Sequence, residues 1–211
     1  KFLAEYAIVQ PSIRLAKGQI GGNPVEEWLK HAEGRLTVGY CRDKNHAKAS
    51  VAEFVRAGIP AAFIESDTPD EERKRVIADF AEGKIRIIFN CQILQMGFDL
   101  AAQIGRKVNV RCVLDLQPTG SLTSQMQKWG RALRYDEAGH AVIIDLAGNS
   151  YESAHGFPCA DRRWILDTAD VHQRDVADRE RDIRLIHCKE CFRPAKLGGL
   201  FCPYCGAIYV V

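Results

Sequence analysis

The chain has 211 residues, of which 46% are hydrophobic and 27% are charged, and these proportions are ordinary for a soluble globular protein. Its 29 lysines and arginines and 27 aspartates and glutamates leave a formal charge of +2, so any surface for nucleic acid must be local. No apolar run approaches the roughly 18 residues that span a membrane, and no signal-peptide pattern is present. We therefore expect one core of ~150 residues with a small appendage, and no membrane partner.

The first segment, residues 1–34, is predicted to be a lead-in that contains one helix. Residues 24–32 form this helix, because Asn23 suits its N-cap, Pro24 suits its first turn, and acidic side chains follow at once. Gly34 then ends the helix, since glycine readily adopts the backbone conformation found after helix ends.

Residues 35–150 alternate between strand-like and helix-like patterns. We expect strands at residues 36–40, 61–64, 85–90, 111–115 and 141–146, and helices at residues 45–57, 69–82 and 121–134. Thr68 and Glu71 have the spacing of a capping box at the start of the helix at residues 69–82. Because strands that alternate with helices pair in parallel through right-handed crossovers, the predicted fold class is α/β, with a parallel sheet flanked by helices.

The predicted helix at residues 121–134 contains the motif Gln-x-x-Gly-Arg-x-x-Arg. Offsets of three, four and seven residues place the motif side chains on one side of a helix. They are Gln127, Gly130, Arg131 and Arg134. A separate apolar stripe is formed by Leu122, Met126, Trp129 and Leu133. Two arginines held in this way suit a polyphosphate, because a guanidinium binds phosphate oxygens bidentately. An ordinary solvated basic face is the alternative.

A polar loop that contains Gly97-x-Asp99 follows the predicted strand at residues 85–90. In doubly wound α/β proteins, ligands bind in such loops at the carboxyl ends of buried strands. Taken in order, the strand, this loop and the motif helix resemble motifs V and VI of the second RecA-like domain of superfamily 2 helicases. The resemblance extends from about Arg35 to Asn149.

The resemblance implies that ATP lies in a cleft between this domain and a first RecA-like domain. Arg134 would then be the arginine finger, Arg131 its partner on the γ-phosphate, and Gln127 a hydrogen-bonding group for the phosphates or the attacking water. Gly130 would let the cleft close. For either arginine, a surface salt bridge is the structural alternative.

Two loop residues would complete the nucleotide site by resemblance. Asp99 would accept a hydrogen bond from a ribose hydroxyl, and Gly97 would permit close approach of the backbone. A helix cap is the alternative role for Asp99. No Gly-x4-Gly-Lys-Ser/Thr phosphate loop occurs in the sequence, so ATP and Mg²⁺ are expected only together with the first RecA-like domain. The chain alone is therefore expected to have no ATPase activity.

Nucleic acid would run over the tops of the strands, held through its phosphates. The expected contacts are Arg42, Lys44, Ser66, Asn90 and Cys91. Contacts of this kind are sensitive to salt and indifferent to base sequence. DNA is expected rather than RNA, although no residue distinguishes the two. The family usually has a hydroxyl residue where this chain has Asn90-Cys91, and often an acid where it has Gln95, so the coupling between strand contact and ATP is left open.

The end of the chain changes in composition. Residues 151–187 are dense in interleaved charges, and we expect a solvated connecting arm with weak ion pairs. Residues 188–211 contain two Cys-x-x-Cys pairs, formed by Cys188, Cys191, Cys202 and Cys205. Four thiolates favour a structural Zn²⁺ ion, which would stabilise so small a module. The segment resembles a zinc ribbon, and a redox dithiol pair or an iron–sulfur cluster is the alternative.

Cysteines that hold a metal indicate a reducing compartment, and hence a cytoplasmic protein. Together, the motor motifs and the cysteine-rich tail resemble phage-type DEAD/DEAH helicases that carry a C-terminal zinc ribbon. The predicted function is the second motor domain of an ATP-dependent helicase or translocase, which supplies arginine fingers and grips the nucleic-acid backbone. The alternative is a non-catalytic module, with a degenerate RecA-like fold and the zinc ribbon, that binds nucleic acid or a partner.

Overall fold

A computed structural model of the chain describes residues 5–11, 20–91, 99–134, 140–151, 155–159, 185–187, 194–196, 201 and 206. The chain divides into two compact units, Lys1–Asn149 and Ser150–Val211. Within the described ranges, every helix is too short or too polar to cross a membrane.

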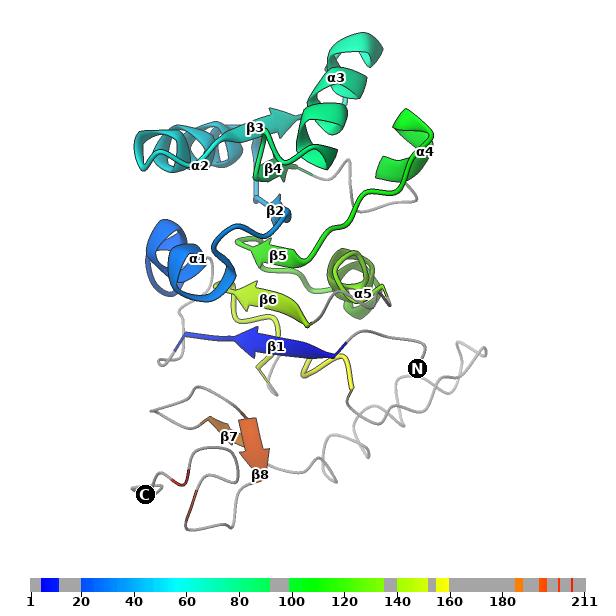
Figure 1. The fold of residues 1–211 in the computed structure, drawn as a ribbon. Helices are drawn as coiled ribbons and strands as arrows, with labels where there is room; N and C mark the ends of the chain where they lie inside the picture. Colours follow the sequence, from blue (N-terminus) through cyan, green and yellow to red (C-terminus); the bar gives the residue numbers. More distant parts are fainter. Residues whose placement is uncertain are drawn as a thin grey trace. The chain divides into compact units, whose positions relative to one another are not determined.

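The first unit is built on a sheet of six parallel strands (Figure 1). The order across the sheet is β1-β6-β5-β2-β4-β3. The strands are β1 (Tyr6–Val9), β2 (Thr37–Tyr40), β3 (Ala61–Ile64), β4 (Ile87–Asn90), β5 (Cys112–Asp115) and β6 (Ala141–Asp145). Parallel neighbours need long crossover connections, which helices supply here. The predicted α/β fold with a parallel sheet is therefore confirmed.

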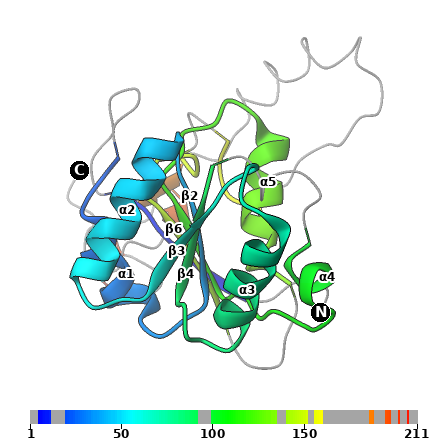
Figure 2. The same cartoon turned by 90° about the horizontal axis from the view of Figure 1, so that it is seen from above.

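Helices cover both faces of this sheet. Helices α1 and α2 lie on one face, and α3, α4 and α5 lie on the other (Figures 1 and 2). The helices are α1 (Pro24–Ala32), α2 (Lys44–Arg56), α3 (Asp70–Ala81), α4 (Leu100–Ile104) and α5 (Leu122–Gly130). Because both faces are covered, every residue of β2, β4, β5 and β6 is buried.

Three aromatic side chains organise the core that α1 and α2 form with the sheet. The ring centroids of Trp28 and Phe54 are 6.1 Å apart, and those of Phe54 and Phe89 are 5.3 Å apart. Trp28 Nε1 donates a hydrogen bond of 2.7 Å to Thr37 Oγ1, so its polar end is satisfied inside the core. Phe89 also covers Gly39 on the neighbouring strand. A Cβ atom at Gly39 would lie 2.3 Å from Phe89 Cδ1, so no larger residue fits there unless the ring moves.

Two elements of the first unit were not expected from the sequence. Strand β1 lies within the predicted lead-in and pairs with β6, with Tyr6 opposite Ala141. The lead-in therefore contributes an edge strand as well as its predicted helix. Helix α4 has five residues, too few to show a helical period in the sequence.

Two helix ends also differ from the prediction. Helix α5 ends at Gly130 rather than at residue 134, and Arg131 is its C-cap. The capping box predicted at the start of α3 is wrong, because the N-cap is Pro69 and no side chain bonds to the first turn. The Thr68 hydroxyl instead accepts a hydrogen bond of 3.0 Å from Glu65 N, which closes the turn before the helix.

In the second unit, β7 (Leu185–His187) pairs with β8 (Pro194–Lys196) in antiparallel fashion, with Ile186 opposite Ala195. The four cysteines of the predicted zinc site lie outside the described residues, as does most of the predicted connecting arm. The residues that are described contain no group of three or more His, Cys, Asp or Glu side chains placed to hold a metal. The zinc site therefore stays a prediction.

Candidate functional site

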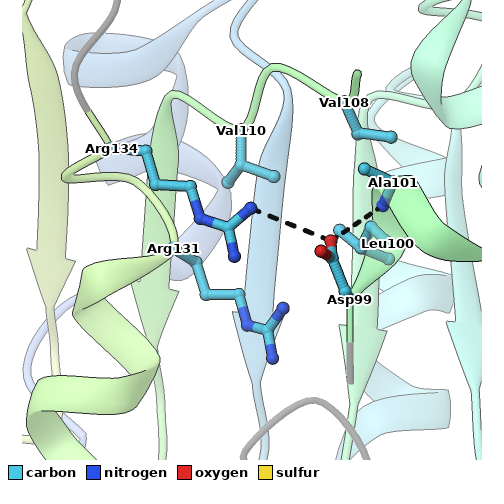
Figure 3. Close-up of a pocket in the computed structure, with 7 residues that line it drawn as sticks. All are labelled: Asp99, Leu100, Ala101, Val108, Val110, Arg131 and Arg134. Carbon is cyan, nitrogen blue, oxygen red and sulfur yellow. Dashed lines mark hydrogen bonds and ion pairs between the residues drawn. The ribbon is translucent and has the colours of Figure 1, made fainter. Parts of the chain in front are cut away.

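An open pocket lies where the start of α4, the segment before β5 and the end of α5 meet (Figure 3). Its lining residues are Asp99, Leu100, Ala101, Val108, Val110, Arg131 and Arg134. Figure 3 shows both arginine side chains extending from one wall toward the side on which Asp99 lies. The structure therefore brings together three of the residues that the sequence assigned to a nucleotide site.

Arg134 is held only weakly by Asp99. Arg134 Nη1 lies 3.8 Å from Asp99 Oδ1, beyond hydrogen-bond range, and the two side chains are 65% and 47% exposed. An ion pair this exposed contributes about 0–1 kcal/mol. A phosphate oxygen can therefore replace the carboxylate as the partner of Arg134 at little energetic cost.

Asp99 is also the N-cap of α4. Its Oδ1 atom accepts a hydrogen bond of 3.0 Å from Ala101 N, so the alternative role of helix cap describes its contact in this structure. Because the carboxylate is about half exposed, capping does not hide it from a ligand. Gly97, the other loop residue assigned to the nucleotide, lies outside the described residues.

Arg131 is less exposed than Arg134 and lies beside the hydroxyl of Tyr40, at the end of β2. Burial raises the pKa of the fully buried Tyr40, and the charge and hydrogen bond of Arg131 oppose part of that shift. Arginine has only donors, so the guanidinium donates and the tyrosine oxygen accepts. The tyrosine hydroxyl thus restrains Arg131, whereas the ion pair of Arg134 with Asp99 is long and exposed.

The other two motif residues lie outside the pocket lining. Gln127 is exposed on α5. Gly130 is the last residue of α5, and a Cβ atom there would meet no atom within 4 Å. The described part of the chain therefore does not itself require glycine at this position. The predicted role of Gly130 in cleft closure depends on a facing domain.

A buried polar network, not anticipated from the sequence, ties the last turn of α5 to the sheet. Lys128 Nζ donates to Asp115 Oδ1 at 2.7 Å, and Trp129 Nε1 donates to Asp115 Oδ2 at 2.9 Å. Asn149 Nδ2 donates to the same Oδ2 atom at 3.0 Å. The Lys128 and Asp115 side chains are both completely buried. Asp115 therefore joins β5, α5 and the segment after β6 at one point.

The buried face of α5 is rotated relative to the predicted apolar stripe. Gln125, Lys128 and Trp129 are completely buried, whereas Leu122 and Met126 are only half-buried. The buried set has the i, i+3, i+4 spacing of one helix face, but two of its members are polar. Hydrophobic periodicity alone does not find a buried face that includes polar side chains.

Two of the predicted nucleic-acid contacts, Arg42 after β2 and Lys44 at the start of α2, are paired with acids. Lys44 Nζ lies 2.6 Å from Glu65 Oε2 and 3.0 Å from Asp67 Oδ2, and these hydrogen bonds raise the pKa of the ammonium above its ordinary value. Arg42 Nε lies 3.0 Å from Asp43 Oδ2. All of these side chains are partly or largely exposed, so a phosphate would compete with the carboxylates.

The remaining predicted nucleic-acid contacts differ in accessibility. Asn90 is completely buried, and its Nδ2 atom donates at 2.9 Å to a backbone carbonyl of β2, so its amide serves the sheet in this structure. Cys91 is half-buried, and its thiol donates to Arg42 O at 3.6 Å. Ser66 is exposed, and its hydroxyl donates to Asp67 Oδ1 at 3.1 Å. At the carboxyl ends of β3 and β4, Ser66 and Cys91 are thus accessible, whereas the Asn90 side chain is not.

Residues 23–136, more than half of the chain, match the model of the helicase conserved C-terminal domain. The chain belongs to this helicase domain family. The matched range of the helicase domain includes both pocket arginines, Asp99 and the buried Asp115 and Lys128, but not Asn149.

Curated relatives carry the same helicase domain within longer proteins. The 51.5 kDa protein of Lactococcus phage (isolate 7-9) is 32% identical over 145 residues, which are 69% of this chain and 30% of the phage protein. The putative ATP-dependent helicase Irc3 of Saccharomyces cerevisiae is 33% identical over 117 residues, which are 55% of this chain and 16% of Irc3. The chain thus spans less than a third of either relative.

Solved structures confirm the fold of the helicase domain. The C-terminal domain of the DEAD-box protein Dbp5 matches 67% of this chain and 76% of its own, with a TM-score of 0.50 and 16% identity. The Escherichia coli DEAD-box protein SrmB matches 71% of this chain and 81% of its own, with a TM-score of 0.51 and 16% identity. The first unit therefore has the RecA-like fold of a helicase C-terminal domain.

The sequence placed the arginines and Asp99 in one site but missed Tyr40, which lies beside Arg131. It also missed the network of Asp115, Lys128 and Asn149 that ties α5 to the sheet. One signal was available, because Asp115 is the single charged residue in the otherwise apolar run at residues 112–116. A charge inside a buried strand needs a buried partner. The sequence did not show which residue that partner is.

Proposed function

We propose that this helicase domain is the second motor domain of an ATP-dependent nucleic-acid helicase or translocase, and that it supplies Arg131 and Arg134 to ATP bound by a first RecA-like domain. The observation that carries the proposal is the pocket, where two guanidinium groups share one open wall and the exposed Arg134 lies 3.8 Å from Asp99. The name of the relative Irc3, a putative ATP-dependent helicase, supports the dependence on ATP.

The arginines have different proposed roles because they are restrained differently. Phosphoryl transfer is accelerated ~10³–10⁵-fold by an arginine that neutralises charge on the transferred phosphate. Arg134 is exposed and weakly paired, so we assign it as the finger that reaches the γ-phosphate. Arg131 is steadied by Tyr40 and is assigned as the fixed second charge. Gln127 is assigned to the phosphates or the attacking water, and Asp99 to the ribose.

The ATP phosphates and Mg²⁺ are assigned to the first RecA-like domain, because this sequence contains no phosphate loop. The chain alone is therefore proposed to be inactive. Its tail, with Cys188, Cys191, Cys202 and Cys205, is proposed to hold one structural Zn²⁺ ion in a zinc ribbon, as the Cys-x-x-Cys spacing supports. Placement among phage-type helicases is supported by the similarity to the Lactococcus phage protein.

Nucleic acid is proposed to bind at the carboxyl edge of β2, β3 and β4. There a backbone phosphate would take the place of Glu65 or Asp67 beside Lys44, and of Asp43 beside Arg42. Because these exchanges are electrostatic, binding would weaken steeply with salt. We propose DNA as the substrate. RNA is the alternative, since one relative, of Meyerozyma guilliermondii, is named ATP-dependent RNA helicase Dbp5.

Replacement of Arg134 by alanine in the full-length protein tests the proposal. We expect kcat for ATP hydrolysis to fall by ~10³, with the Kd for a single strand changed by less than about twofold. Arg56→Ala is the matched control, because Arg56 is exposed at the end of α2, on the other face of the sheet. Unchanged turnover in Arg134→Ala would instead favour the alternative, a non-catalytic RecA-like module with a zinc ribbon that binds nucleic acid or a partner.

A further inference from the structure

Lys128 lies within the arginine motif but does not face the solvent or the pocket. Its Nζ atom donates to Asp115 Oδ1 at 2.7 Å and to Gln117 O at 3.1 Å, and both partners of the ion pair are completely buried. The same ammonium lies 5.6 Å from the centroid of the Tyr40 ring. An electrostatic role toward nucleotide or nucleic acid is therefore closed to Lys128 in this conformation.

The pair is unusually well satisfied for a buried one. Besides Lys128, Asp115 accepts hydrogen bonds from Trp129 Nε1 at 2.9 Å, Asn149 Nδ2 at 3.0 Å and Gln117 N at 3.3 Å. Removing two charges from water is costly, and their attraction offsets that cost only when further hydrogen bonds satisfy both groups. Such a pair is a weak means of gaining stability, but it holds the atoms around it in one geometry.

The geometry that it holds is that of Arg131. Lys128 and Trp129 form the last turn of α5, and the Arg131 backbone N–H bonds to their carbonyls as the helix C-cap. The Arg131 side chain bonds to the hydroxyl of Tyr40, whose ring lies beneath Lys128 Nζ. Asp115 therefore fixes the end of α5, where Arg131 begins the next segment. Lys128 also contacts Tyr40, whose hydroxyl restrains the guanidinium of Arg131.

We propose that Asp115 and Lys128 are positioning residues, a buried ion pair that sets the direction of Arg131 for the γ-phosphate. The proposal rests on the function proposed above. The ion pair makes no contact with ATP, because its effect on turnover passes through Arg131. A misplacement of about 1 Å at a reacting centre can cost ~10² in rate, so loss of the pair is expected to reduce turnover without removing any group from the nucleotide site.

The test is Lys128→Met in the full-length protein, because methionine keeps the length of the side chain and removes its charge. We expect kcat to fall by ~10², with the KM for ATP and the Kd for a single strand within about twofold of the unmodified protein. Lys74→Met is the matched control. Lys74 is half-exposed on α3 and pairs with Glu71 at 2.9 Å, so the same chemical change there leaves turnover unaltered.

A double-mutant cycle separates positioning from a general structural role. If Lys128 acts through Arg131, the double variant Lys128→Met/Arg131→Ala is no slower in single turnover than Arg131→Ala alone. Independent losses that multiply would overturn the proposal. If Arg131→Ala itself leaves turnover unchanged, the function proposed for the domain fails. If Arg131→Ala abolishes turnover while Lys128→Met is normal, only the positioning proposal fails.

A gentler variant covers the case in which Lys128→Met does not fold, as judged by circular dichroism and Tm. Trp129→Phe retains an aromatic ring in the core and removes only the Nε1 donor to Asp115. It is expected to lower kcat severalfold with the KM for ATP unchanged, and to lose that effect in an Arg131→Ala background. Normal turnover in a folded Trp129→Phe protein would count against the proposal.

Discussion

Asp99 and Arg134 face each other across the pocket. The carboxylate oxygen of Asp99 that lies nearest Arg134 is also the one that caps the first turn of α4. Asp99 Oδ1 lies 3.0 Å from Ala101 N and 3.8 Å from Arg134 Nη1. The shorter contact is a hydrogen bond and the longer one is not. The carboxylate is therefore bound firmly to the helix and loosely to the arginine, so substitutions at Asp99 can separate its two roles.

Asp99→Ser keeps an N-cap and removes the carboxylate, whereas Asp99→Ala removes both. For the chain alone, we expect serine to change the free energy of unfolding by less than ~0.5 kcal/mol and alanine to lower it by about 1 kcal/mol. In the full-length protein, both are expected to raise the KM for ATP by roughly tenfold or more, because a hydrogen bond to a charged group is lost. Urea unfolding and steady-state kinetics measure the two effects. A normal KM in Asp99→Ser would restrict Asp99 to capping.

Gly39→Ala is expected to destabilise the first unit. The new Cβ atom would meet Phe89 Cδ1 at 2.3 Å, and overpacking of a well-packed core costs about 1–3 kcal/mol. Urea unfolding followed by tryptophan fluorescence measures the loss, and Phe89→Leu in the same chain should restore part of it.

Gly130→Ala is the matched comparison, because nothing lies within 4 Å of its missing Cβ atom. Alanine at this helical position should leave the chain as stable or raise its stability by up to ~1 kcal/mol. If Gly130 is needed for cleft closure, the same change lowers ATP turnover in the full-length protein.

For Gly39→Ala, a free energy of unfolding equal to that of the unmodified chain would show that Phe89 is not held in place.

Asp67→Asn is expected to strengthen nucleic-acid binding severalfold, and Lys44→Ala to weaken it. Asp67 is a competing anion 3.0 Å from Lys44 Nζ, so its neutralisation leaves the ammonium more available to a phosphate. Removal of one phosphate-binding cation should also reduce the salt dependence of log K by ~1. Fluorescence anisotropy with labelled DNA and RNA strands of one sequence, at several salt concentrations, measures both quantities.

The control for charge alone is Asp79→Asn. Asp79 pairs with Lys84 at 3.5 Å, away from the loops after β2 and β3, and its loss adds the same charge to the protein. An equal gain in affinity from both neutralised aspartates would mean that the edge of the sheet is not the binding surface.

Burial should divide the thiols by their reactivity. Burial raises the pKa of Cys41 and of Cys112 to about 12, so both stay protonated at pH 8 and become nucleophilic only as the pH approaches that value or the protein unfolds. Cys159 is exposed and should react first with iodoacetamide, as followed by peptide mass spectrometry. The proposed zinc ligands should be protected until a chelator is added: Cys188, Cys191, Cys202 and Cys205.

Two outcomes of this labelling experiment would contradict the predictions for the buried and the metal-bound thiols. Fast labelling of Cys41 in the native protein would mean that the end of β2 opens readily. Labelling of the four tail cysteines at the same rate with and without chelator would remove the zinc site. Labelling in urea, where all thiols should react, is the control for the intrinsic chemistry.

The sequence predicted the alternation of strands and helices because buried parallel strands and amphipathic helices have clear periods. It missed β1, since a four-residue edge strand has no pattern that separates it from a loop. The Thr68-x-x-Glu71 spacing was misleading for a different reason: the hydroxyl has two possible backbone partners, and local spacing does not decide between them.

The candidate site was predictable only where its chemistry is local. Arg131 and Arg134 stand four and seven residues after Gln127, so one helix relates them. The buried pair of Lys128 with Asp115 joins residues 13 apart in the chain, and Asn149 joins them from 34 residues beyond Asp115. Such partners are chosen by the packed sheet, which a periodic pattern does not describe.

The strand order has a practical consequence for how the domain is cut from a longer protein. Residues 23–136, which match the helicase C-terminal domain model, exclude both β1 and β6. A protein trimmed to that range would leave the backbone edge of β5 uncovered, which invites aggregation, and would take Asn149 away from Asp115. Expression of a well-behaved domain should therefore begin before Tyr6 and continue past Asn149.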